Sequence, residues 1–481
     1  MQCRETGCFI GKPDAAQVMA RLASTVLCLL VCLAPMALGS NRPLAWDCNA
    51  AGAGLVGLAA AAVLWAERRA WQFRRFGLLI VPVSLWTVAL AWAGIQLLPL
   101  GGSALAHPAW KLLGPLSQGG ELGAISVNPG ATETSLLRFL TYVIVFLSTC
   151  VIARDASRAN RLLRVILVAA VLYALYGLLR LSMNAQSILW FDEPVSQALT
   201  ATFINRNSAA TYFGVCTCIS FAFLLRKFRR LAEAVDAERG LASSLERLLS
   251  AFVAGAAMEF AGFIVLFTAT LLTQSRAGIV ATIAALCAGA VVQLLRRRAD
   301  GGIVAVLAGS GALAAVAAGL QMSGSRFALR LIGTDALSDE RLAVYRDTLA
   351  AISDHFWLGS GLGTFPDIFP LYRNATPVSG TIWDKAHSDY LEILLGLGVP
   401  GGLAVILGVV AVVLVCFSGA LGRRRDSHLP LAGAMTGCLI GLHGLVDFSL
   451  QIQAVALTAV VILGVGVAQS TSSRKPKTEL R

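Results

Sequence analysis

Long, nearly uncharged apolar blocks recur along the whole chain and constrain its fold more than any other feature. Each approaches the roughly 20 residues that a helix needs to cross a bilayer. The twelve blocks lie at residues 18–39, 49–66, 76–99, 136–153, 160–182, 207–225, 251–272, 277–295, 302–321, 400–420, 430–447 and 451–469. Because their apolar residues run continuously instead of alternating, a transmembrane β-barrel is excluded. The sequence therefore predicts an all-α, polytopic membrane protein of about 12 transmembrane helices.

The composition also excludes the soluble, disordered and disulfide-rich classes of protein. Of the 481 residues, 57% are hydrophobic and 14% are charged, and the mean hydropathy is +0.72. Soluble domains are about 45–50% apolar and about 25% charged. Cys216-x-Cys218 lies inside an apolar block and lacks the spacing of a zinc site, so no metal site is predicted.

The net charge of +12 is explained by basic loops that recur between alternate apolar blocks. These loops carry Arg68–Arg75, Arg154–Arg164, Arg226–Arg230, Arg296–Arg298, Arg423–Arg425 and Arg474–Lys477. Such loops face the cytoplasm, so both termini are predicted there and nucleic acid is not expected as a partner. The loops on the other side of the bilayer would face the periplasm, if the chain lies in a bacterial inner membrane. The first block ends in small residues, but with eleven further blocks we expect a retained anchor.

The blocks and loops divide the chain into four parts. Residues 1–321 are predicted to hold nine transmembrane helices, and 322–399 one large periplasmic loop. Three C-terminal transmembrane helices follow in 400–470, and 471–481 form a cytoplasmic tail. A long loop in a compact bundle is usually functional or disordered, and the aromatic content of this one favours a folded working domain.

Within that loop, Ser338–Arg341 has the composition of a helix start. Apolar spacing through Leu342, Tyr345, Leu349 and Ile352 predicts an amphipathic helix, which Gly359–Gly363 should end. On the cytoplasmic side, Arg226–Arg247 mixes both charge signs. This stretch could be an amphipathic surface helix or a solvated linker.

Three groups of polar residues on the external side are candidates for chemistry. Arg276 stands where little other positive charge occurs, and its guanidinium could bind phosphate oxygens in bidentate fashion. It could instead anchor to lipid headgroups. Arg341 and Arg346 are five residues apart, so they do not share one helix face perfectly and one could be solvated. His387 is predicted at the external end of a span, and the Gly and Pro residues of 396–402 that follow it should break the helix. It could be an acid/base group, or a residue that only fills the membrane interface.

These motifs resemble those of a known family. His387–Ser388, nine residues and Gly398-x-x-Gly401 are similar to the bacterial O-antigen ligase signature, and Gly359–Phe365 and Ser275–Gly278 resemble two further family segments. Residues 203–210 and 443–448 are similar to polysaccharide ligase and polymerase sequences. The ligase signature usually ends in Thr-Thr, where this chain has Gly402–Leu403. Ligase and Wzy-type polymerase therefore both stay open.

The resemblance implies a fold like that of type C glycosyltransferases and an inverting transfer that needs no metal or cofactor. The glycan would pass from undecaprenyl pyrophosphate to lipid A–core or to a growing polysaccharide, in contact with membrane lipid. His387 and Arg276 would be catalytic, and the pyrophosphate would bind Arg276, Arg341 and Arg346. The residues that would support them are Asn205, Arg206, Asn207, Ser388, His443 and Asp447. The alternative is a lipid-linked oligosaccharide flippase or other polysaccharide transporter, but internal duplication and mid-membrane polar residues are not evident.

Overall fold

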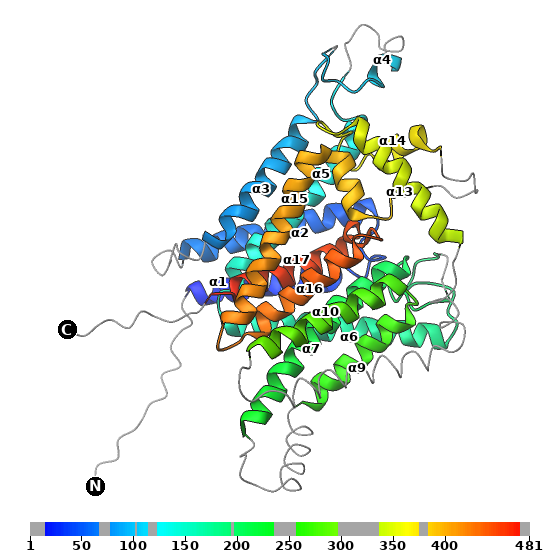
Figure 1. The fold of residues 1–481 in the computed structure, drawn as a ribbon. Helices are drawn as coiled ribbons and strands as arrows, with labels where there is room; N and C mark the ends of the chain where they lie inside the picture. Colours follow the sequence, from blue (N-terminus) through cyan, green and yellow to red (C-terminus); the bar gives the residue numbers. More distant parts are fainter. Residues whose placement is uncertain are drawn as a thin grey trace, which may run out of the picture.

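The described part of the chain is built from helices (Figure 1). The computed structural model describes residues 15–66, 77–101, 103–113, 123–193, 197–234, 256–296, 336–374 and 383–471. The helices are α1 (Ala15–Leu33), α2 (Pro43–Ala66), α3 (Gly77–Ile95), α4 (Trp110–Leu113), α5 (Pro129–Ile152), α6 (Ala156–Ser182), α7 (Arg206–Ala234), α9 (Ala257–Leu272), α10 (Arg276–Arg296), α13 (Ala336–Asp354), α14 (Phe365–Tyr372), α15 (Asp389–Gly422), α16 (His428–His443), the 3₁₀ helix η4 (Ser449–Gln451) and α17 (Gln453–Ala468). Within these ranges β structure is limited to one isolated bridge.

Eight of these helices are long and apolar enough to cross a membrane: α1, α2, α3, α5, α6, α7, α10 and α15. The helices α9 and α17 are apolar but shorter. The predicted all-helical, multi-pass membrane protein is confirmed at this level, and the count of twelve spans stays a prediction. The ninth block, 302–321, lies outside the described residues. In the stretch Arg226–Arg247, α7 stays helical to Ala234, and residues 235–247 lie outside the described ranges as well.

The centre of the bundle is formed by α7, α16 and α17. The apolar window of α7 is entirely buried, and nearly every residue of α16 and α17 is buried too. Outer helices such as α2 and α3 instead expose large apolar side chains, for example Leu58 and Val88, as expected for helices that contact lipid. The ends of the central helices are therefore the places where polar side chains can gather away from lipid.

The helix α15 begins inside the segment that the sequence assigned to the periplasmic loop. Ser388 is its N-cap and accepts a hydrogen bond from the backbone N–H of Leu391. The expected break appears at Gly398, where φ is 71° and ψ is 164°, a conformation open almost only to glycine. Pro400 therefore opens a second helical segment, where its missing N–H costs little. The helix therefore extends N-terminally beyond the apolar block 400–420, because Ser388 caps an earlier turn.

The glycine-rich turn after α13 is locked to this break in α15. Three backbone hydrogen bonds, with N···O distances of 2.7 to 3.0 Å, join residues 356–361 to residues 395–399. A Cβ on Gly359 would lie 2.3 Å from a carbonyl oxygen of α15, and a Cβ on Gly398 would lie 2.6 Å from the carbonyl oxygen of Trp357. The two glycine motifs thus interlock, and they seat the end of α13 against α15.

The helix predicted in the long loop is present as α13, and its predicted face is buried only in part, since Ile352 is buried and Tyr345 half-buried. Leu342 and Leu349 are 63% and 55% exposed. Val344, Thr348 and Ala351 are buried instead, on the side that packs against α14 and α15. Apolar residues thus occur on two sides of α13, and its packing against α14 and α15 determines which side is buried.

Candidate active site

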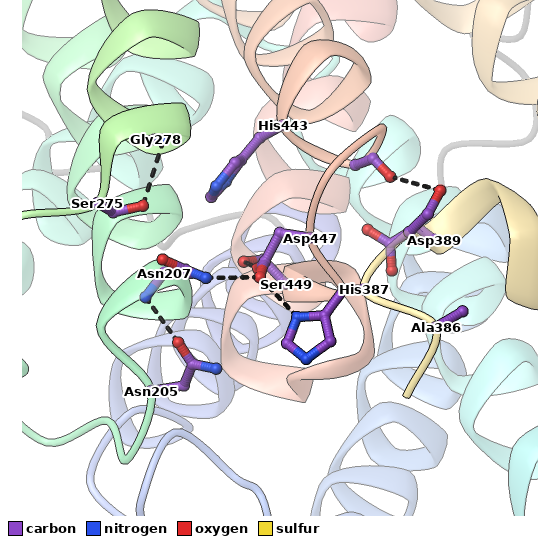
Figure 2. A network of polar contacts seen from close by, with 12 residues as sticks. Asn205, Asn207, Ser275, Gly278, Ala386, His387, Asp389, His443, Asp447 and Ser449 are labelled. Carbon is purple, nitrogen blue, oxygen red and sulfur yellow. Dashed lines mark hydrogen bonds and ion pairs between the residues drawn. The ribbon is translucent and has the colours of Figure 1, made fainter. Parts of the chain in front are cut away.

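Polar side chains from four separate parts of the chain meet at one end of the central helices (Figure 2). They come from the start of α7, the start of α10, the loop before α15 and the segment between α16 and η4. The helix α13 reaches the same place, because Tyr345 donates a hydrogen bond to the backbone carbonyl of His387. Residues that are far apart in sequence therefore build a single site.

His387 lies in the loop just before α15 and has an unusual backbone conformation. Its φ is 53°, in the left-handed region that few residues other than glycine adopt. The rings of Trp383 and Phe448 meet its imidazole edge to face, at centroid distances of 5.3 and 4.9 Å. Its Nδ1 lies 4.0 Å from Oδ1 of Asp447, which is too long for a hydrogen bond but close enough for a charge interaction.

Asp447 is fully buried and is held by two donors. Nδ2 of Asn207 donates to its Oδ1 at 2.8 Å, and the hydroxyl of Ser449 donates to its other oxygen. Asn205 sits just before α7 and accepts a hydrogen bond from the backbone N–H of Asn207 at 2.7 Å, so it caps that helix. The pair of asparagines therefore has two tasks: one starts the helix and the other orients the carboxylate.

His443, the last residue of α16, forms a second polar contact with α7. Its Nδ1 lies 2.6 Å from the hydroxyl of Thr211, and that hydroxyl also donates to the carbonyl of Asn207. Nδ1 of His443 is therefore the donor in this pair. Its buried Nε2 has no hydrogen-bond partner in the part of the chain that the structure describes. His443 thus fixes the end of α16 to α7, one turn beyond Asn207.

Burial and Arg341 lower the pKa of His387. Burial of the imidazole has the largest effect, and the positive charge of Arg341 acts in the same direction. The carboxylates of Asp447 and Asp384 act against them. The imidazole is therefore neutral at pH 7. Its buried Nδ1 faces Asp447 but has no hydrogen-bond partner in the described ranges, so no hydrogen bond selects the tautomer of this ring.

The two arginines of α13 have different surroundings. Arg341 is half-buried, and its charge acts on both His387 and His443. Arg346 is exposed. Their spacing by five residues left open which of them faces the site, and the structure assigns that position to Arg341.

The start of α10 explains the Ser-Arg-x-Gly motif in physical terms. Ser275 accepts a hydrogen bond from the backbone N–H of Gly278 at 3.3 Å and so caps the helix. A Cβ on Gly278 would lie 2.6 Å from the Cβ of Ala210, so the glycine allows α10 to pack closely on α7. Arg276 is the half-buried first residue of α10, beside these contacts.

The two remaining predicted residues, Ser388 and Arg206, lie at the starts of helices. Ser388 is buried, and its hydroxyl also donates to the carbonyl of Gly444, which joins α15 to the end of α16. Arg206 is exposed between the two asparagines. Sequence reasoning missed the roles of Tyr345, Thr211 and Ser449. Two features of the sequence could have pointed to these roles. Tyr345 stands one helical turn after Arg341, and Ser449 stands two residues after Asp447.

A cavity of about 240 Å³ lies between α3, α5, α15 and α17. Its walls are largely apolar and include Trp86, Phe139, Phe146, Val409 and Val460. Its polar lining residues are Ser135, Arg138, Tyr142, Asp389, Glu392 and Gln451. Since Asp389 is two residues from His387, the cavity lies close to the site along the chain. Across the described ranges, no group of three or more His, Cys, Asp or Glu side chains could hold a metal ion.

A known protein family matches the part of the chain that carries three of the candidate residues. Residues 261–406 match the family model described as O-antigen ligase. This match supports the O-antigen ligase superfamily for that segment of the chain. Arg276, Arg341 and His387 lie inside the matched region, whereas Asn207 and Asp447 lie outside it. A search of curated proteins finds no match to this chain.

Proposed function

We propose that this O-antigen ligase relative is a glycosyltransferase that moves a glycan from undecaprenyl pyrophosphate to an acceptor hydroxyl. One observation supports this most strongly. The buried carboxylate of Asp447 faces Nδ1 of His387, while Arg341 is near enough to affect the pKa of that imidazole. A proton acceptor beside a guanidinium is what transfer from a lipid pyrophosphate requires.

In the proposed reaction, Nε2 of His387 takes the proton of the acceptor hydroxyl. The hydroxyl oxygen forms a bond to the anomeric carbon as the bond from that carbon to the pyrophosphate oxygen breaks. The electron pair leaves with the pyrophosphate, and Arg341 and Arg276 would stabilise its charge without a metal. Asp447 would stabilise the imidazolium that forms. One displacement inverts the anomeric carbon.

We propose that the cavity beside Asp389 takes part of the polyprenyl chain of the donor. Its walls are largely apolar, and two of its lining residues, Asp389 and Glu392, closely follow the loop that bears His387. Val409 lines this cavity, whereas Val410, its neighbour on α15, is 44% exposed elsewhere. We expect Val409→Trp to raise KM for a long-chain carrier more than for a short-chain analogue. Val410→Trp is the control, and equal effects of the two substitutions would exclude this location.

The decisive test of the function is His387→Ala, assayed for glycan transfer with purified protein in liposomes. General acid–base catalysis is worth about 10²–10⁴-fold, and we expect a loss of that size. His428→Ala is a matched control, because His428 is also buried and its Nε2 lies 2.8 Å from Oδ1 of Asn160. It begins α16, whereas the site lies at the other end of that helix. That variant should lose stability but keep its turnover per folded molecule. Near-normal transfer by His387→Ala would exclude the catalytic role.

Asp447→Asn tests the partner of the histidine. The asparagine keeps the shape of the side chain but removes the charge that raises the pKa of His387. That pKa should therefore fall further, and the acid limb of the pH–rate profile should move to lower pH while the maximal rate drops. An unchanged acid limb would mean that Asp447 does not act on His387.

Ligase and polymerase activities remain two forms of this proposal, because Gly402–Leu403 departs from the ligase signature. A deletion strain separates them. Loss of all glycan attached to lipid A indicates a ligase, and retention of a single repeat unit indicates a polymerase. If the purified protein moves the lipid-linked glycan across liposomes without transferring it, the protein is a transporter instead.

We further propose an inner-membrane location with the site facing the periplasm. The alternating basic loops support this orientation. Reporter fusions after Arg298 and after Arg425 should read as cytoplasmic, and a fusion within 365–385 as periplasmic. A cytoplasmic signal from the last fusion would contradict the placement of the site.

A further inference from the structure

The left-handed backbone of His387 is held from two sides. The backbone N–H of the preceding Ala386 donates to Oε1 of Glu392 at 2.8 Å, within the same segment of chain. The carbonyl of His387 accepts a hydrogen bond at 2.9 Å from the phenol of Tyr345, which belongs to α13. A non-glycine residue in this region is strained, so such a conformation persists only where its surroundings enforce it.

The hydrogen bond from Tyr345 differs from the one to Glu392, because Tyr345 belongs to α13, the helix that also carries Arg341. The two residues are four apart, so they lie on the same face of the helix. Burial raises the pKa of Tyr345, which keeps the phenol protonated as a donor. One hydrogen bond therefore connects His387 to the helix whose arginine acts on it.

We propose that Tyr345 is a positioning residue that ties α13 to His387 and so fixes Arg341 relative to the imidazole. This inference rests on the proposed function, in which His387 takes a proton and Arg341 meets the pyrophosphate. Without the phenol, the carbonyl of His387 loses its contact with α13. The imidazole and the guanidinium then no longer keep one relative position.

The loss of this tie has a defined effect on the titration of His387. The charged groups that act on its imidazole are Arg341 from α13, Asp447 from the segment after α16, and Asp384 and Lys385 from its own loop. Loosening α13 weakens two influences that lower the pKa of His387, namely its burial and the charge of Arg341. The pKa should therefore rise, so that less neutral imidazole is present at a given pH.

The test compares Tyr345→Phe with Tyr173→Phe. The phenol of Tyr173 also donates to a backbone carbonyl, that of Cys32, at 2.8 Å, and it is half-buried as well. We expect Tyr345→Phe to lower kcat about 3- to 10-fold, the size of one hydrogen bond, and to move the acid limb of the profile to higher pH. Tyr173→Phe should change neither.

A second measurement does not depend on activity. Diethyl pyrocarbonate reacts with the neutral form of a histidine and not with its protonated form. The rate of modification at His387, followed by peptide mass spectrometry against pH, therefore reports the pKa of this imidazole. The midpoint should be higher in Tyr345→Phe than in the wild type. An unchanged midpoint in monodisperse, folded protein would overturn the positioning role. If the midpoint moves but His387→Ala is fully active, the positioning inference stands and the proposed catalytic role fails.

Discussion

Gly398→Ala is expected to be among the most damaging small substitutions in the membrane region. Its φ of 71° and ψ of 164° cost about 1–3 kcal/mol for a residue with a side chain. The new Cβ would also lie 2.6 Å from the carbonyl oxygen of Trp357 and 2.9 Å from the backbone nitrogen of Gly359. Neither of these backbone atoms can withdraw alone, because three hydrogen bonds hold this turn to α15.

Relief of the clash must weaken those hydrogen bonds, each worth about 0.5–1.5 kcal/mol. With the backbone strain included, we expect a loss of ~3–6 kcal/mol in the free energy of unfolding. Titration with a denaturing detergent measures this, and limited proteolysis at 356–361 should show the released turn. Gly94→Ala on α3 is the control, because a Cβ there meets nothing within 4 Å and should be neutral or slightly stabilising. Equal unfolding curves for the two variants would refute the interlock.

Three further outcomes are expected. Arg276→Lys keeps one charge but loses the bidentate fork, so transfer should fall strongly at unchanged membrane levels, and near-wild-type transfer would leave Arg276 as a headgroup anchor. Arg341→Ala should lower the rate of transfer about 10²-fold, whereas substitution of the exposed Arg346 by Ala should change it by no more than about 2-fold. Equal losses would contradict the assignment of Arg341 as the arginine that faces the site. Nε2 of His107 lies 2.9 Å from Nε2 of His355, and burial and then His355 lower the pKa of His107 from 6.5 to about 4. The stability that this pair contributes should be complete above pH 6.5 and should decline toward pH 4. Proteolysis of residues 103–113, followed against pH, measures this decline, and His107→Phe should remove it.

The sequence alone determined the class of the protein and the location of most helices. Continuous apolar blocks can satisfy their backbone in a membrane only as helices, so each described block holds a helix, although α2, α5 and α15 begin before their blocks. The sequence also indicated individual residues that start or interrupt helices. Ser275 was visible as part of a motif before its capping contact was known, and Gly398 as the point where a helix must break.

Only the tertiary structure decided how the candidate site is assembled. Asp447 lies sixty residues after His387 and is oriented by Asn207, which precedes it by far more. No periodicity records such a pairing, because it depends on how α7 and α16 pack. The choice of Arg341 over Arg346 and the role of Tyr345 likewise follow from which face of α13 is turned inward. Apolar residues on both sides of that helix leave its rotation undetermined until α14 and α15 pack against it.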